Sequence, residues 1–163
     1  MAKQNDTTSN HSFSSDFNLD SDYIADPLFN NGIYRANVTS VKLDLEAHAI
    51  IWELVCDGNE DAVKSDGETP IDGSKLYFRN YLPKPEDAEL MTASGSMSKR
   101  QSKINQLKKF ADKMQISMNN MAEIAEHCDN ADWIGITVLA TTKNEEYNGN
   151  ISTKVNDMRR AAE

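Results

Sequence analysis

Residues 75–83 have the sequence Lys75-Leu76-Tyr77-Phe78-Arg79-Asn80-Tyr81-Leu82-Pro83. Successive side chains of a β-strand point to opposite faces, so this stretch predicts a strand with two different faces. Leu76, Phe78 and Leu82 form an apolar face that we expect to meet the core. The opposite face carries Lys75, Tyr77, Arg79 and Tyr81. Cations suit phosphates and aromatic rings suit unstacked bases, so this second face is typical of a surface that binds single-stranded nucleic acid.

Two more strands are predicted before this one. A turn signal, Asn30-Asn31-Gly32, precedes residues 33–45, whose apolar side chains alternate and then change face near Val41 and Leu43. Such a change of face indicates a bulge or a bend. Residues 49–56 alternate again and predict the second strand, in which Trp52 is expected either to anchor the core or to join the binding face.

Helices and two further strands are predicted after residue 83. Pro83 and Pro85 end the third strand, and Ser98 can cap a helix whose apolar side chains recur at helical spacing. A shorter helix is predicted after Asn119 or Asn120, and Met121 in its apolar stripe is expected to fill the core. The β pattern returns over residues 133–142, and the turn signal Asn148-Gly149 leads into a last strand over residues 150–156.

This order of elements predicts a mainly β protein. Five strands with a helical segment between the third and the fourth are the order of the oligonucleotide-binding (OB) barrel, in which strands two and three contribute to the ligand surface. The chain has 163 residues, enough for one such domain, which we place over residues 28–160. Residues 1–27 are polar and acidic and predict a disordered tail. Its aromatic and acidic side chains favour either a solvated linker or a segment that docks on a basic groove, in this chain or in a partner.

The charge of the chain is unevenly distributed. The net charge is −9, which by itself disfavours a nucleic-acid partner. However, residues 99–113 contain six cations and one Asp. The connection over residues 57–74 is acidic and is expected to lie away from a nucleic-acid path or to act as a gate beside it. The chain lacks a run of about 18 apolar residues and a signal segment, so we expect a protein of the cytoplasm with no membrane partner.

Metal-binding and catalytic alternatives have little support in the sequence. Asp44, Glu46 and His48 alternate as metal ligands can, but they also suit the polar end of a hairpin. In the 57–74 loop, acidic and amide side chains have a calcium-like spacing, but Ala62 stands where the calcium loop requires Gly. The histidines are scattered and no nucleophile motif is present, so we expect neither an enzyme nor a cofactor or metal site.

Several short motifs together resemble a known family, the phage-encoded single-stranded DNA-binding proteins with an OB barrel. These motifs are Gly32-Ile33-Tyr34-Arg35-Ala36, Ile50-Ile51-Trp52, the 75–83 stretch, Ser98-Lys99-Arg100-Gln101-Ser102-Lys103, Ala131-Asp132-Trp133-Ile134-Gly135 and Tyr147-Asn148-Gly149. The resemblance implies sequence-tolerant coating of single strands during phage DNA replication, recombination or repair in an infected bacterial cell. It also implies phage or host replication and recombination proteins as partners, and it leaves a homo-oligomer open.

The predicted site follows from the 75–83 stretch and the basic helix. Tyr77 and Tyr81 are expected to stack on bases. Phosphate contacts are expected first from Arg79, Lys75 and Arg35, and then from Lys99, Arg100, Lys103 and Lys154. The alternative is an acidic OB module that binds or regulates a replication or transcription enzyme, which the negative net charge favours.

Overall fold

A computed structural model of the chain describes residues 15–162. A short helix precedes a sheet of five strands, and two further helices with a 3-10 turn are inserted between the third and fourth strands. The elements are α2 (Leu19–Asp22), β1 (Gly32–Asp44), β2 (Ala49–Cys56), β3 (Lys75–Tyr81), η1 (Pro85–Glu89), α3 (Lys99–Met114), α4 (Met121–Asp129), β4 (Thr137–Tyr147) and β5 (Asn150–Arg160). The fold is therefore mainly β, as the sequence predicted.

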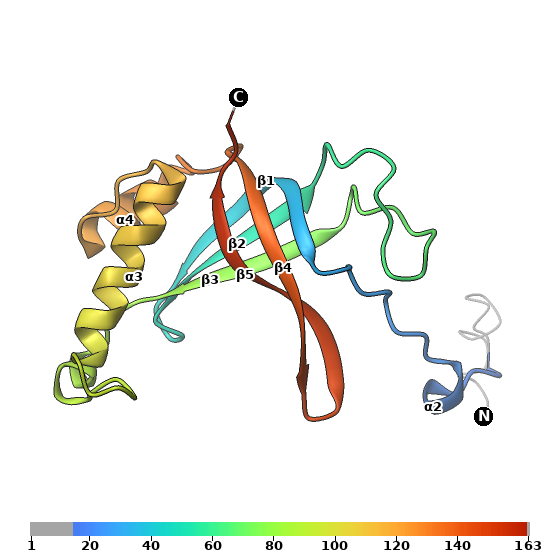
Figure 1. Ribbon diagram of the computed structural model, residues 1–163, viewed down its shortest axis with the longest axis horizontal. Helices are drawn as coiled ribbons and strands as arrows, with labels where there is room; N and C mark the ends of the chain where they lie inside the picture. The colour runs from blue at the N-terminus through green and yellow to red at the C-terminus, as the bar shows by residue number, and fades with distance from the viewer. Residues whose placement is uncertain (1–14, 163) are drawn as a thin grey trace, which may run out of the picture.

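The five strands form one antiparallel sheet in the order β3-β2-β1-β4-β5 (Figure 1). The register of β1 against β2 shifts between Val38 and Ser40, which is the predicted bulge where the apolar face changes. The β4–β5 hairpin turns at Asn148 and Gly149, whose φ angles of 52° and 81° are both positive. This conformation suits the right-handed twist of a hairpin, and Asn-Gly adopts it readily.

The closed barrel expected from the sequence is not formed by the hydrogen bonds of this sheet. β3 and β5 are the two edge strands, and within residues 15–162 they approach each other without forming a ladder. The structure thus contains a five-stranded antiparallel sheet with inserted helices, open between β3 and β5. Periodicity predicts strands and their faces, but closure depends on how far the strands twist, which the pattern does not specify.

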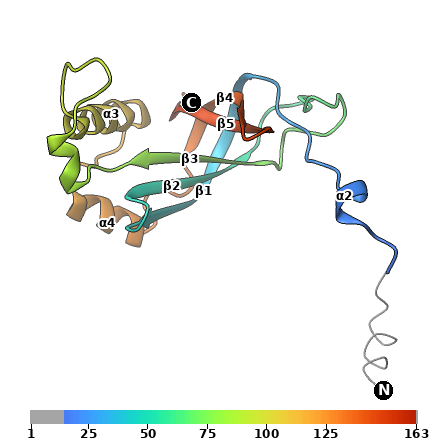
Figure 2. The same cartoon turned by 90° about the horizontal axis from the view of Figure 1, so that it is seen from below.

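The inserted helices lie together at one end of the sheet, on the side away from α2 (Figures 1 and 2). Ser98 caps α3 by accepting a hydrogen bond from the Gln101 amide, as predicted. Asn120 caps α4 in the same way, by accepting from the Glu123 amide. The apolar stripe of α3 buries Phe110, Ala111 and Met114.

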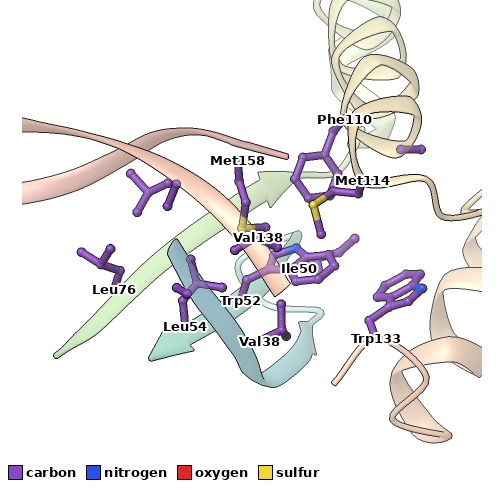
Figure 3. Packing of buried hydrophobic residues seen from close by; sticks show 14 of the residues in the cluster. Val38, Ile50, Trp52, Leu54, Leu76, Phe110, Met114, Trp133, Val138 and Met158 are labelled. Carbon is purple, nitrogen blue, oxygen red and sulfur yellow. The ribbon is translucent and has the colours of Figure 1, made fainter. Parts of the chain in front are cut away.

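Trp52 is the centre of the core (Figure 3). Its indole is fully buried, stacks on Trp133 with ring centroids 5.3 Å apart, and meets Phe110 edge-on at 5.4 Å. Its Nε1 donates a 2.7 Å hydrogen bond to Oδ1 of Asn80, which is also buried. Of the two expectations for Trp52, the core position is therefore correct. Through these three contacts, one residue joins β2, β3, α3 and the segment before β4.

Three details of the sequence prediction are wrong. β4 begins at Thr137, because residues 131–135 form a turn with positive φ at Ala131 and Gly135. β5 continues to Arg160, beyond the predicted end at residue 156. Met121, predicted to fill the core, is 46% exposed.

The predicted tail falls partly outside the described residues. Residues 1–14 lie outside them, and residues 19–22 form the single turn α2, which Asn18 caps. Residue 29 already belongs to the core, because Phe29 is buried. Among the described residues, no helix combines the length and the apolar character needed to cross a bilayer.

Replacing Asn80 by Ala should lower the free energy of unfolding by about 1–3 kcal/mol, because it leaves the buried indole N–H of Trp52 without a partner. Urea denaturation followed by tryptophan fluorescence measures this loss. Asn150→Ala, at an exposed position at the start of β5, is the matched control and should change stability little. Equal effects of the two substitutions would contradict this role for Asn80.

His127 should make stability depend on pH. A 2.8 Å contact between its Nδ1 and Asp132 raises the pKa of His127 above the ordinary value of 6.5, and Glu123 raises it further. The folded state then binds the proton more tightly than the unfolded state, so this stabilisation is complete below pH 6.5 and is lost as the pH rises through the folded pKa.

Urea denaturation of the wild type and of His127→Gln from pH 5.5 to pH 8.5 tests this dependence. The difference between their free energies of unfolding should shrink as the pH rises. A difference that grows with rising pH would show that the neutral imidazole is the form that the fold prefers.

Candidate nucleic-acid interface

A groove of about 990 Å³ lies between the outer face of β3 and the edge strand β5. We call it the β3–β5 groove. Its walls are completed by residues 25–29 with Tyr23, by Lys64 of the 57–74 loop and by Glu145 of β4. Five of the predicted site residues meet here, namely Lys75, Tyr77, Arg79, Tyr81 and Lys154.

The alternation of β3 positions its aromatic rings in this groove. Leu76 and Leu82 are 4% and 3% exposed, whereas Tyr77 and Tyr81 are 54% and 56% exposed. The two rings share one face of the strand four residues apart, which at about 3.3 Å per residue separates them by roughly 13 Å. Arg79 lies between them on the same face. The outer surface of β3 thus offers a ring, a guanidinium and a second ring in a row.

Glu53 of β2 restrains the start of this row. Its Oε2 accepts a hydrogen bond of 3.3 Å from the Tyr77 hydroxyl and lies 3.6 Å from Nζ of Lys75. The Thr39 hydroxyl donates to Oε1 at 2.8 Å and, together with Lys75, lowers the pKa of Glu53. Glu53 therefore stays ionised, fixes the edge of the Tyr77 ring and partly neutralises Lys75.

Three other cations of the groove, unlike Lys75, have no carboxylate partner among the described residues. Among the described residues, the side chains of Arg79 and Lys154 have no hydrogen-bond or ion-pair partner, and both groups are exposed. Nζ of Lys64 lies 5.4 Å from the centre of the Phe29 ring, a cation–π contact that leaves its charge intact. These three side chains are available for an anionic ligand.

The groove has a positive balance within an acidic protein. Its lining contains the cations Lys64, Lys75, Arg79 and Lys154 but only two carboxylates, Asp26 and Glu145, a balance of four minus two, or +2. None of the acidic side chains of the 57–74 loop lines it.

Some of these loop carboxylates are held by local hydrogen bonds instead. Asp72 accepts from the backbone and side chain of Asn59. Asp66 accepts from the Thr69 hydroxyl and backbone, and those bonds lower its pKa. The loop thus lies beside the groove and turns Lys64 toward it. Its position relative to a nucleic-acid strand stays a prediction.

A small hydrogen-bond network attaches the N-terminal segment to the wall of the groove. The Phe29 amide donates to Oγ1 of Thr153 at 3.1 Å, and the Thr153 hydroxyl donates to Oδ1 of Asn144 at 2.7 Å. Nδ2 of Asn144 donates to the Phe29 carbonyl at 2.8 Å, which closes the network. Phe29 is therefore held against β4 and β5, whereas Tyr23 is 74% exposed.

The groove continues toward α3. A smaller hollow of about 220 Å³ shares Arg79 and Tyr81 with it and adds Lys109 and Lys113 of α3. Lys113 pairs with Asp157 at 2.7 Å, whereas Lys109 has no such partner among residues 15–162. One surface therefore runs from Lys64 past both tyrosines to Lys109.

Four predicted site residues lie elsewhere. Arg35 packs against Gly58 at the base of the 57–74 loop. Lys99 and Arg100 begin α3, and Arg100 lines a different groove, between α3 and α4. Lys103 makes a 2.7 Å ion pair with the buried Asp87, and their hydrogen bond lowers the pKa of this carboxyl. The pair fastens η1 to α3, so Lys103 has a structural partner.

Other residues of the groove were not predicted from the sequence. Lys64 was overlooked because its loop is acidic as a whole, and Ile151, which is 55% exposed, was assigned only to a strand. Phe29 was given no role, although its position just before the Asn30-Asn31-Gly32 turn is a signal that it packs with the first strand.

The metal alternatives do not correspond to clusters in the structure. Oδ1 of Asp44 accepts a 3.0 Å hydrogen bond from the Ala47 amide and thereby shapes the β1–β2 turn. Across residues 15–162, no three His, Cys, Asp or Glu side chains gather as a metal site would require.

Comparisons with known proteins do not assign this groove to a family. Neither the models of known protein families nor the curated proteins give a match to the chain. The chemistry of the groove itself is therefore the guide to its function.

Proposed function

We propose that this protein is a sequence-tolerant binder of single-stranded DNA and that the strand lies in the β3–β5 groove. One observation carries the proposal: two exposed tyrosine rings alternate along the outer face of β3 with the Arg79 guanidinium, which has no partner within residues 15–162. Stacking platforms combined with cations are the means by which proteins hold single strands without reading the base sequence.

The groove residues divide into two roles in this proposal. Tyr77 and Tyr81 stack on bases, and each stack contributes about 1–3 kcal/mol. Arg79, Lys154 and Lys64 contact phosphates, and Lys75 does so in competition with Glu53. Because every base has a π-face, such contacts tolerate any sequence, and a duplex, whose bases are already stacked, cannot use the rings.

The topology supports the same proposal. The order β3-β2-β1-β4-β5, with helices between β3 and β4, matches that of an OB barrel whose edges β3 and β5 face each other. We infer that the chain has this fold, in which β3 contributes to the ligand surface. Its resemblance to phage single-stranded DNA-binding proteins then suggests a non-enzymatic role in phage DNA replication or recombination, in the cytoplasm of an infected bacterium.

An acidic protein-interaction module is the second candidate. It is favoured by the net charge of −9 and by the acidic segment before β1. In that case the protein would bind a replication or transcription enzyme, and the groove would lack affinity for oligonucleotides.

Replacing Tyr77 and Tyr81 together by Ala should weaken binding to fluorescein-labelled oligo-dT. Each lost stack should cost about 1–3 kcal/mol, which is a factor of about 5 to about 150 in Kd. Fluorescence anisotropy measures the change. Both side chains are half exposed, so circular dichroism and the unfolding midpoint should stay close to those of the wild type.

Tyr147→Ala provides the matched control, because Tyr147 is an exposed tyrosine at the β4–β5 turn outside the groove. It should leave the Kd unchanged. If the folded double variant bound oligo-dT as tightly as the wild type, β3 would not be the binding surface.

A further inference from the structure

A second groove lies on the helical end of the molecule. It has a volume of about 870 Å³ and runs between α3, α4 and the chain over residues 82–85. Its apolar lining includes Pro83, Ile104, Leu107, Ile116, Met121 and Ile124. Ile124 is buried, Ile104, Leu107 and Ile116 are half-buried, and Met121 is 46% exposed. The structure thus leaves an apolar surface between two helices open to solvent.

Cations surround this apolar surface. Lys84, Arg100 and Lys108 line the groove, against a single carboxylate, that of Asp112. Nζ of Lys108 lies 2.9 Å from Asp112, so this pair is locally neutral. Arg100 has no side-chain hydrogen-bond or ion-pair partner among the described residues. The charge of Lys84 acts on the buried Asp87, whose carboxylate already pairs with Lys103. The groove is therefore suited to a segment that combines apolar side chains with carboxylates.

The N-terminal segment of the same chain has this composition. Phe17, Leu19, Tyr23 and Ile24 are between 65% and 88% exposed and alternate with aspartates of the stretch 16–26. Hydrogen bonds to the side chain of Asn18, not packing, form the turn of α2. Large exposed apolar side chains gain about 25 cal/mol for each Å² that a partner covers.

Residues 17–24 lie far from the groove between α3 and α4 of the same chain. Phe29 is anchored on β4 and β5, and α2 lies at the opposite end of the molecule from α3 and α4 in both views (Figures 1 and 2). The segment between Phe17 and Phe29 extends by at most about 40 Å. It therefore projects outward, where the helical end of a neighbouring copy can meet it.

We propose that residues 17–24 of one copy bind the groove between α3 and α4 of a second copy. Phe17, Leu19 and their apolar neighbours cover Met121, Ile116 and Leu107, and the aspartates face Arg100 and Lys84. The contact joins two different surfaces, so each pair leaves one groove and one segment free and the copies can add head to tail. Added salt weakens the contact, because part of the attraction is between exposed charges.

Sedimentation velocity of the full chain without DNA tests this contact. The wild type should form dimers and longer chains as its concentration rises, less so at 0.5 M salt. Two full-length variants should each remain monomeric: Met121→Glu in the groove, and the combined Phe17→Ser, Leu19→Ser, Tyr23→Ser and Ile24→Ser substitutions in the segment. All five positions are exposed, so the fold should survive, and circular dichroism verifies this.

Mixing the two variants gives the sharpest result. The Met121→Glu copy still has its segment and the serine variant still has its groove, so an equimolar mixture should form a dimer that does not grow further. Arg100→Glu is a second groove variant and should also abolish association.

A wild type that stays monomeric at all concentrations, or a mixture of folded variants that gives no dimer, would overturn the proposal. Association that is lost with Tyr77→Ala but kept with Met121→Glu would overturn it too, by moving the contact to the β3–β5 groove.

Discussion

The buried hydrogen bond between the Trp52 indole and Asn80 fixes which face of β3 is turned toward the core. It links the buried faces of β2 and β3 inside a core that also holds Trp133 and Phe110. Because side chains alternate along a strand, an inward Asn80 forces Arg79 and Tyr81 outward, and Tyr77 with them. A shift of one residue would bury a guanidinium and two hydroxyls and expose Leu76 and Leu82. The core thus determines which face of β3 meets the groove.

The local sequence pattern was sufficient to predict features that a single strand, helix or turn determines. It predicted the faces of β3, the bulge after Val38, the Ser98 cap and the Asn148-Gly149 turn, because each depends on residues adjacent in sequence. The local pattern did not predict contacts between residues that are far apart in the sequence. The pairing of Lys103 with Asp87 and the anchoring of Phe29 by Asn144 depend on tertiary packing. The open edge between β3 and β5 likewise depends on the arrangement of whole strands, which local pattern does not specify.

Charge is organised locally in this protein, and the net value of −9 hides this arrangement. Asp66 and Asp72 are held by hydrogen bonds within their loop, while Lys64 of the same loop lines the β3–β5 groove. The second groove, between α3 and α4, is likewise lined by cations, among them Lys84 and Arg100. Each groove therefore combines apolar or aromatic surface with a modest excess of cations, and burial or stacking should contribute more affinity than charge does.

The most direct test of single-strand binding in the β3–β5 groove is fluorescence anisotropy with matched single-stranded and duplex oligonucleotides at several salt concentrations. We expect clear preference for the single strand. Three free cations, Arg79, Lys154 and Lys64, should give a slope of log K against log salt of about −2, at about −0.7 for each phosphate contacted. Equal affinity for the duplex, or no binding to the single strand at low salt, would contradict the proposal that this protein binds single-stranded DNA.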